Sequence, residues 1–292
     1  MVKIIFSLVL SVVVQHSLAQ ASAPQNKGWL YYGGDQGGRH YSETNQINKK
    51  NVEDLDVAWV HKNGDMQTFG EEMKNTSAQS TPILLPEDAG DALVYCTVFN
   101  RVIALDPATG KERWQFDPKI SHEGTRTFRC RGVSYSQETE LAENVLCRHR
   151  ILVATHDRRL LAIDSRTGKA CKNFGDNGQI KLYGAEGFKA GDIANSSAPA
   201  VGNGVIVVGS AIVDFDRTAA PRGTVQAFSS LDGKPLWSFD PLVGENEFGA
   251  TERTWDIGFE GKIAVDDVAS NGLIADNTAP RTTASDGTRW SH

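Results

Sequence analysis

The stretch VIALDPATGKERWQF (residues 102–116) decides the fold, because the chain repeats its pattern twice. LLAIDSRTGKACKNF (residues 160–174) and VQAFSSLDGKPLWSF (residues 225–239) show the same order of features. In each copy an alternating apolar run ends in Asp or Ser, a polar turn follows, and a second run carries a large ring. This order predicts three β-hairpins. The turn position that needs a positive φ is a glycine in every copy: Gly110, Gly168 and Gly233.

Further apolar runs precede these hairpins, and together they predict four strands per unit. The longer runs are ALVYCTV (residues 92–98), RILVATH (150–156) and GVIVVGS (204–210), and the shorter ones TPILL (81–85) and SAPAV (197–201). Units of four short antiparallel strands form propeller blades or sandwich layers, and the repetition favours the propeller. The hairpins recur roughly every 60 residues, longer than the roughly 40–50 of compact blades, so we expect inserted loops. The predicted fold is all-β, a partial β-propeller with blades near residues 78–118, 133–175 and 197–241.

The segment before the first blade predicts one more strand. LDVAWVHKNGD (residues 55–65) carries Trp59 ahead of an Asn63–Gly64 turn and has no hairpin of its own. In closed propellers an amino-terminal strand often completes the last blade. After Pro241 the strand pattern weakens. We therefore expect about three and a half blades, a fragment belonging to the front of a larger ring.

Length and charge bound the kind of protein. The 292 residues can bury a substantial core. The formal net charge of −6 gives no basic footprint for nucleic acid, so no nucleic-acid partner is expected.

The amino terminus has the pattern of a signal peptide. Lys3 precedes an apolar stretch at residues 4–14, and Ser17 and Ala19 are the small residues that suit cleavage after Ala19. A membrane anchor is the alternative, but the stretch is shorter than the roughly 20 residues that span a bilayer. We expect residues 1–19 to be removed on export to the periplasm, residues 20–27 to be a polar leader, and residues 28–292 to form the propeller.

Export permits disulfides among the four cysteines. Cys147 and Cys171 are predicted to begin the second and fourth strands of the second blade, so they lie at one end of it and a bridge is expected. Cys96 and Cys130 have no evident partner. The chain has no C-x-x-C-H, so covalent c-type haem is not expected.

Three sets of residues carry a family resemblance. They are YYGGDQGGRHYSETNQINKKNVEDLDVAW (residues 31–59), CRGVSY (130–135) and the TGK turns with their aromatic residues. This ordered set resembles the pyrroloquinoline-quinone (PQQ)-dependent dehydrogenases, and within them the glucose/quinate/shikimate branch. The resemblance implies an eight-bladed propeller whose neighbouring blades are joined by docked tryptophans. Trp59, Trp114 and Trp237 fill those positions, and Phe174 takes the place in the second blade.

The resemblance also implies an activity. PQQ would accept a hydride, and with it two electrons, from a sugar or polyol hydroxyl, helped by a divalent metal and a carboxylate base. The protein's part is to hold the quinone and orient the alcohol. Calcium or magnesium is the expected metal, and both require oxygen ligands. The electrons would pass on to a quinone acceptor, and the enzyme would be periplasmic, with membrane association also open.

Site residues follow from the same resemblance. Arg131 matches the arginine that anchors the quinone, since a guanidinium presents charged donors to carboxylate and quinone oxygens. Ser196 matches a hydroxyl that contacts the cofactor. Gln79 stands where a cofactor-contacting glutamate is common, which retains hydrogen bonding but loses the charge. Asp214 and Asn277 match metal ligands.

Other positions depart from the family pattern or have a structural interpretation. Thr127 replaces a histidine, Phe215 replaces an asparagine, and Trp255 lies out of register with the tryptophan beneath the quinone. The family's catalytic aspartate belongs to later blades, so no base is predicted. His156 and Asp157 are interpreted as a solvated turn. Two further acids are interpreted as turn caps: Asp106 and Asp164.

Two functions remain open at this stage. One is a PQQ-dependent dehydrogenase, for which this chain would be catalytically incomplete. The other is a non-catalytic propeller, either a degenerate fragment or a binding scaffold, since propellers serve many functions.

Overall fold

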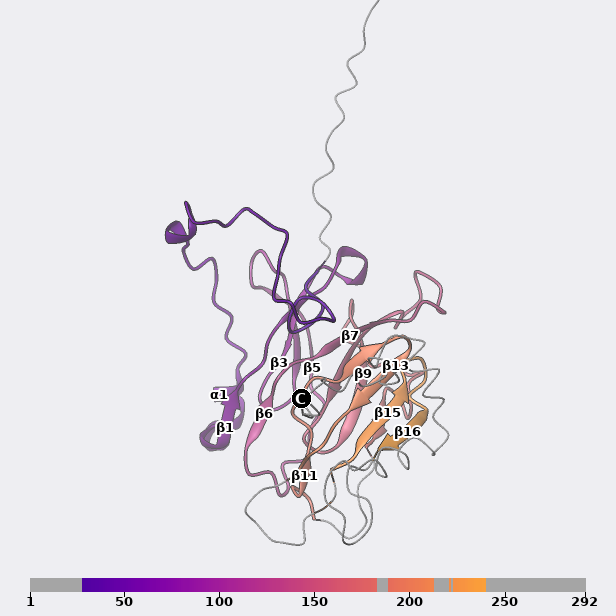
Figure 1. The fold of residues 1–292 in the computed structure, drawn as a ribbon. Coiled ribbons are helices and arrows are strands. Elements are labelled where there is room, and N and C mark those ends of the chain that lie inside the picture. Colours follow the sequence, from indigo (N-terminus) through magenta and orange to yellow (C-terminus); the bar gives the residue numbers. More distant parts are fainter. Residues whose placement is uncertain (1–27, 183–188, 213–220, 222, 240–292) are drawn as a thin grey trace, which may run out of the picture.

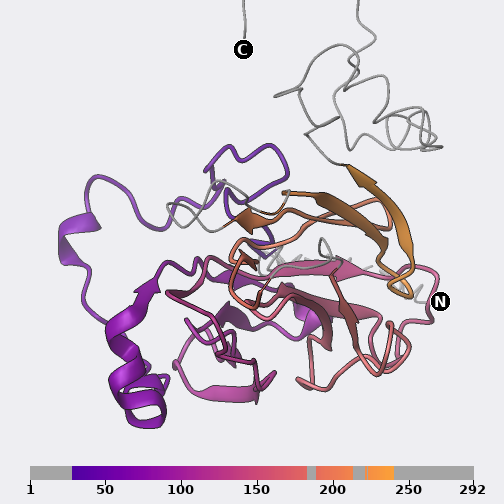
Figure 2. The same cartoon turned by 90° about the horizontal axis from the view of Figure 1, so that it is seen from below.

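The computed structural model describes residues 28–182, 189–212, 221 and 223–239. Within these residues the chain forms three four-stranded antiparallel sheets that follow one another along the sequence and lie side by side (Figures 1 and 2). The all-β propeller fold is therefore confirmed for the described part. The sheets are called the first, second and third blades below.

Each blade is a meander of neighbouring strands. The first contains β2 (Ile83–Leu84), β3 (Leu93–Cys96), β4 (Val102–Leu105) and β5 (Glu112–Phe116). The second contains β7 (Ser134–Gln137), β8 (His149–Ala154), β9 (Arg159–Asp164) and β10 (Gln179–Lys181). The third contains β12 (Ala200–Gly202), β13 (Val205–Val208), β15 (Val225–Ser229) and β16 (Pro235–Phe239).

Short elements connect the blades. Strands β1 (Thr76–Ala78) and β6 (Phe128–Cys130) pair in parallel, and β11 (Ile193–Ala194) pairs antiparallel with β14 (Ala211–Ile212). Before the first blade lie helix α1 (Asp65–Phe69) and two 3-10 helices, Val52–Asp54 and Gly70–Asn75, and a further one, Glu87–Ala89, lies between β2 and β3. None of the helices in the described ranges is long and apolar enough to cross a membrane.

Strand alternation divides the core into two layers. Successive side chains of a strand point to opposite faces. Ile151 and Val153 of β8 therefore pack toward the first blade, with Val94, whereas Leu152 packs toward the third, with Ile206. Since β8 is buried along its whole length, the second blade is covered on both faces.

The three predicted turn glycines have the expected backbone. Their φ values are 67° at Gly110, 70° at Gly168 and 75° at Gly233. The two aspartates interpreted as caps are confirmed. Asp106 Oδ1 accepts from the Thr109 amide at 2.8 Å, and Asp164 Oδ1 accepts from the Thr167 amide at 2.9 Å.

Aromatic rings dock onto these glycines from the preceding segment. Trp59 lies against Gly110 and donates its indole N–H to Pro107 O at 3.1 Å. Trp114 lies against Gly168 in the same way and donates to Ser165 O at 3.0 Å. A Cβ on either glycine would overlap the ring, so the predicted docking of these two tryptophans is confirmed.

At the junction of the second and third blades, the ring contact and the hydrogen bond that a tryptophan makes elsewhere come from two different residues. The Phe174 ring lies against Gly233 but has no N–H to donate. Arg150 fills that role: its Nη1 donates to Ser230 O at 2.5 Å and to Leu231 O at 2.9 Å. Its guanidinium also lies 5.9 Å from the centre of the Phe174 ring. Ser230 is the counterpart of Pro107 and Ser165 in the repeat.

Two strand predictions are wrong. The fourth strand of the second blade is β10, whereas residues 172–174 form a turn after Cys171. The insertion of Gly175 and Gly178, both with positive φ, turns the chain back so that the later segment pairs with β9. Residues 55–63 pair with no strand of the described structure, and Asp65 begins α1 instead.

Both pairs of cysteines form disulfides. The expected Cys147–Cys171 bridge is confirmed. Cys96 and Cys130, for which the sequence indicated no evident partner, are bonded to each other. The parallel β1–β6 pairing brings the end of β6 beside the end of β3, which the sequence does not indicate locally.

Candidate cofactor site

The three predicted cofactor residues lie together. Arg131 donates from Nε to Gln79 Oε1 at 3.1 Å and from Nη1 to Ser196 Oγ at 3.2 Å. Gln79 and Ser196 are far from Arg131 in the sequence and belong to the segments that enter the first and third blades. Ser196 is buried, while Arg131 and Gln79 are exposed. The guanidinium thus bridges three blades at a surface open to a ligand.

Backbone hydrogen bonds hold this arrangement. The Arg131 amide donates to Ser196 O at 2.8 Å, and the Thr81 amide donates to Arg131 O at 3.0 Å. Each of the segments involved leads into the innermost strand of its blade, β2, β7 or β12. The position of the site is therefore set by where three neighbouring inner strands begin.

A cavity of about 490 Å³ opens beside the arginine, lined by Tyr32, Gln79, Thr81, Arg131 and Ala198. A larger cavity of about 620 Å³ shares Tyr32, Thr81, Arg131 and Ala198 and continues along the 30–38 loop and the inner strands. No described residue accepts a hydrogen bond from Arg131 Nη2. Sequence reasoning missed Tyr32 and Thr81, although Thr81 lies only two residues after Gln79.

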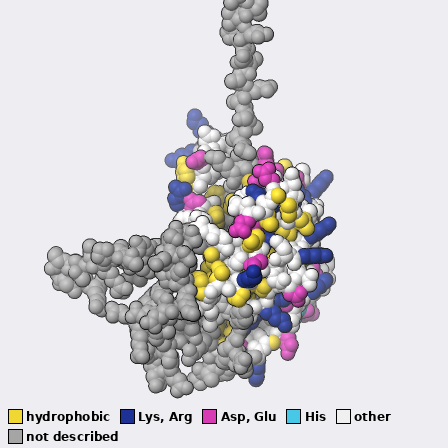
Figure 3. Space-filling model, turned by 90° about the vertical axis from the view of Figure 1, so that its right-hand side faces the viewer, with side chains coloured by type: hydrophobic (Ala, Val, Ile, Leu, Met, Phe, Trp, Pro, Cys, Tyr) yellow, Lys and Arg dark blue, Asp and Glu magenta, His cyan; other side chains and the backbone are white. Residues whose placement is uncertain are grey.

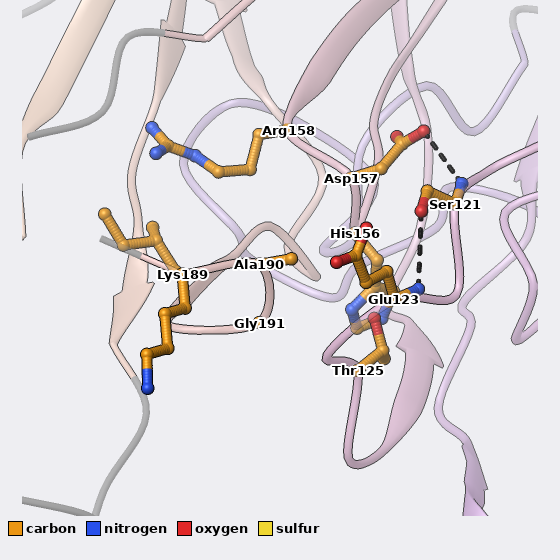
Figure 4. A pocket seen from close by; sticks show the side chains of 10 residues that line it. Ser121, Glu123, Thr125, His156, Asp157, Arg158, Lys189, Ala190 and Gly191 are labelled. Carbon is orange, nitrogen blue, oxygen red and sulfur yellow. Dashed lines mark hydrogen bonds between the residues drawn. The ribbon is translucent and has the colours of Figure 1, made fainter. Parts of the chain in front are cut away.

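A separate cavity lies at the turn between β8 and β9. It has a volume of about 270 Å³, with Arg158 and Lys189 on one side and His156, Asp157 and Glu123 on the other (Figure 4). The interpretation of His156 and Asp157 as a solvated turn is wrong. The Ser121 amide of the β5–β6 loop donates to Asp157 Oδ2 at 3.1 Å, and His156 packs against Phe128 and Arg129 of β6 and is only 5% exposed.

His156 is held in one orientation. Its Nε2 contacts Arg129 O at 2.6 Å, and its own amide donates to Asn100 Oδ1 at 3.0 Å. Burial lowers the pKa of the imidazole, so the neutral ring is favoured. The Arg129 amide also donates to this Nε2 at 2.9 Å, and Nδ1 is buried without a partner among the described residues.

The metal ligands predicted from the resemblance, Asp214 and Asn277, lie outside the described residues, as do Phe215 and Trp255. Within the described ranges no group of three or more His, Cys, Asp or Glu side chains could hold a metal ion. Thr127 immediately precedes β6. On the face shown in Figure 3, acidic and basic side chains of the described residues are interspersed with hydrophobic ones.

Comparison with known proteins identifies the family. Residues 29–263 match the family model described as "PQQ: Glucose/ethanol/alcohol dehydrogenase, beta-propeller domain". The chain belongs to this family.

Individual relatives agree with this assignment. The chain is 35% identical to the glycerol dehydrogenase large subunit of Gluconobacter oxydans, over 78% of this chain and 30% of that protein. It is 34% identical to quinoprotein glucose dehydrogenase A of Acinetobacter calcoaceticus, over 73% of this chain and 28% of that protein. The quinohemoprotein alcohol dehydrogenase of Comamonas testosteroni shares the fold, with a TM-score of 0.57 and 24% identity over 80% of this chain and 30% of that structure. The chain thus spans about 30% of the length of the relatives it matches.

The hydrogen-bond donors around Arg131 suit PQQ, the family's cofactor. PQQ presents carboxylates and quinone oxygens, all of which accept hydrogen bonds. Arg131 offers the charged planar donors that such oxygens favour, and its Nη2 has no acceptor among the described residues. Thr81 lines the same cavity and adds a hydroxyl donor, while the buried Ser196 accepts from the arginine and holds it in place. The residues present therefore fit PQQ.

Proposed function

We propose that this chain contributes cofactor-binding blades of a periplasmic PQQ-dependent dehydrogenase that oxidises a sugar or polyol hydroxyl. The observation that supports the proposal is the bridge from Arg131 to Gln79 and Ser196 beside an open cavity. When bound, PQQ would supply the acceptor for the hydride that leaves the alcohol carbon.

The chain's own residues would bind and orient the cofactor. Arg131 would present Nη2 to a PQQ oxygen while Gln79 and Ser196 hold the guanidinium in place. Calcium or magnesium would be held by Asp214 and Asn277, together with further oxygen ligands. Glycerol, glucose and quinate or shikimate, named for the relatives, indicate the polyhydroxylated class of substrate. A quinone would then accept the electrons.

A binding titration tests the proposal without requiring turnover. PQQ is added to the purified chain, and quenching of tryptophan fluorescence gives Kd. A hydrogen bond from a charged group contributes about 1.5–3 kcal/mol, so Arg131→Ala should raise Kd roughly 10- to 100-fold. The control is Arg166→Ala, because Arg166 lies at the Gly168 turn and donates to Asp88 O, away from the site.

Saturable binding that is weakened only by Arg131→Ala would support the dehydrogenase. Absence of binding, or equal Kd values for both variants, would contradict the proposal and favour a propeller scaffold that does not use PQQ.

A further inference from the structure

The Cys96–Cys130 disulfide lies directly behind the cofactor site. Cys130 ends β6 and is followed at once by Arg131. Cys96 ends β3 in the first blade, so the bond ties the segment carrying the arginine to the neighbouring blade. Both cysteines are buried, with 2% and 1% of their surface exposed.

The same bond also restrains the segment that carries Gln79. In the parallel β1–β6 pair, Ala78 lies opposite Cys130, and Gln79 follows Ala78. Ser80 Oγ then accepts from the Cys96 amide at 3.3 Å. The disulfide is therefore bonded covalently to the segment that presents Arg131, and hydrogen bonds join it to the segment that presents Gln79.

The strand pairing between these two segments is short, and beyond it they are joined only at the site itself, by the Thr81–Arg131 backbone bond and the Arg131–Gln79 bond among the contacts of the described residues. Strands β1 and β6 are three residues long and pair only with each other. Short, isolated pairings of this kind are the parts of a protein that open most easily. The disulfide removes that freedom, and a site held in its binding geometry loses less entropy when ligand arrives.

The second disulfide is a natural comparison. Cys147–Cys171 lies at the other end of the second blade, where the Cys147 amide donates to Asp164 Oδ2 in the Gly168 turn. It is equally buried and closes a loop of similar size, 24 residues apart against 34 for Cys96–Cys130. Loss of either bond should therefore cost similar global stability.

We propose that the Cys96–Cys130 disulfide is a positioning element of the cofactor site, so that PQQ binds tightly only when this bond is formed. The inference rests on the proposed function, and it extends that function to a dependence on oxidative folding. Reduction breaks the S–S bond, adds two electrons and two protons from the reductant, and frees β6 to move away from β3. By reciprocity, bound PQQ must oppose this reduction by the same factor.

The first experiment measures PQQ affinity in two double variants of the full chain, Cys96→Ala/Cys130→Ala and Cys147→Ala/Cys171→Ala. The first should raise Kd about tenfold, within the range usual for coupled sites, and the second should leave it near the wild-type value. Equal Kd values for both variants would overturn the inference.

The second experiment needs no variant and applies even where the first pair of substitutions prevents folding. The oxidised wild-type chain is brought to equilibrium under nitrogen in buffers of reduced and oxidised dithiothreitol at a series of ratios, with and without PQQ, which the reagent converts to its quinol. Freed thiols are alkylated and identified by mass spectrometry. At equilibrium, the cofactor should raise about tenfold the ratio of reduced to oxidised dithiothreitol at which half of Cys96–Cys130 is reduced, and should leave that ratio unchanged for Cys147–Cys171.

Protection of both bonds, or of neither, would overturn the inference. Failure of the oxidised wild-type chain to bind PQQ at all is a different result, since it would overturn the proposed function itself.

Discussion

Replacing Arg150 tests how much its hydrogen bonds stabilise the junction of the second and third blades. Arg150 is fully buried, and its Nε donates to Cys147 O at 2.8 Å in addition to the two bonds to Ser230 and Leu231. Arg150→Met keeps most of the apolar length but leaves three carbonyl groups without this donor. Each buried unpaired acceptor costs about 1–3 kcal/mol.

An opposing effect reduces the total cost of the three unpaired carbonyl groups. Burial lowers the pKa of Arg150, which shows that the charged form is disfavoured by desolvation, and nearby Glu138 offsets this only in part. Removing a buried charge recovers some of that cost. We therefore expect Arg150→Met to lower the free energy of unfolding by about 2–4 kcal/mol, measured by urea denaturation.

A second substitution tests whether Arg150 replaces an indole. In the Arg150→Met background, Phe174→Trp should restore about 1 kcal/mol, because the indole N–H can reach Ser230 O as Trp114 reaches Ser165 O. In the wild-type background the larger ring should instead destabilise by about 1–3 kcal/mol, since it meets the guanidinium already above Phe174.

The control is Trp114→Phe, which removes one neutral hydrogen bond and should cost about 0.5–1.5 kcal/mol. If Phe174→Trp has the same effect in both backgrounds, or if Arg150→Met costs under about 0.5 kcal/mol, the reasoning is refuted.

Two further predictions concern the blades and the reaction. Trp114→Ala should destabilise the chain by about 3–5 kcal/mol in chemical denaturation, because the docked ring leaves a cavity against Gly168; a loss within the range of surface substitutions would contradict the docking. Residues 20–292 supplied with PQQ and calcium or magnesium should not oxidise glucose, quinate or shikimate in a dye-linked assay. The reason is that the chain spans about 30% of the length of its relatives, and none of the site residues predicted in it is a general base. Turnover above the background of free PQQ would contradict this prediction.

The blades could be predicted because their signals are local. A hairpin turn needs a residue with positive φ at one position, and a glycine there between two apolar runs is visible within fifteen residues. The β10 strand escaped prediction because two extra glycines, Gly175 and Gly178, insert a loop before it. In the other two blades the second run of the hairpin is itself the outer strand, β5 or β16.

The features that escaped prediction depend on contacts between distant segments. The Cys96–Cys130 bond needs the parallel β1–β6 pairing, which joins residues about 50 positions apart. His156 is polar and lies in a two-strand turn, so its local sequence indicates solvent. Its burial results from contacts with other parts of the chain, namely Phe128 and Arg129 of β6 and Asn100.

The candidate site lies between these two cases in how far it could be predicted. Its residues are distant in the sequence, but they occupy equivalent positions of the repeat. Gln79, Arg131 and Ser196 each lie a few residues before the innermost strand of a blade, β2, β7 and β12. Equivalent positions of neighbouring blades lie next to one another, so three residues about 50 to 65 positions apart meet at one place.

This geometry explains why only one of the three needs a charge. Gln79 and Ser196 each contact Arg131. The backbone bonds from Thr81 to Arg131 and from Arg131 to Ser196 fix all three segments relative to one another. A second cation in place of Gln79 or Ser196 would repel the guanidinium, whereas an amide and a hydroxyl orient it. Gln79 in place of an acid then has a consequence for binding: Arg131 keeps its full positive charge available to an anionic ligand instead of sharing it with a neighbouring carboxylate.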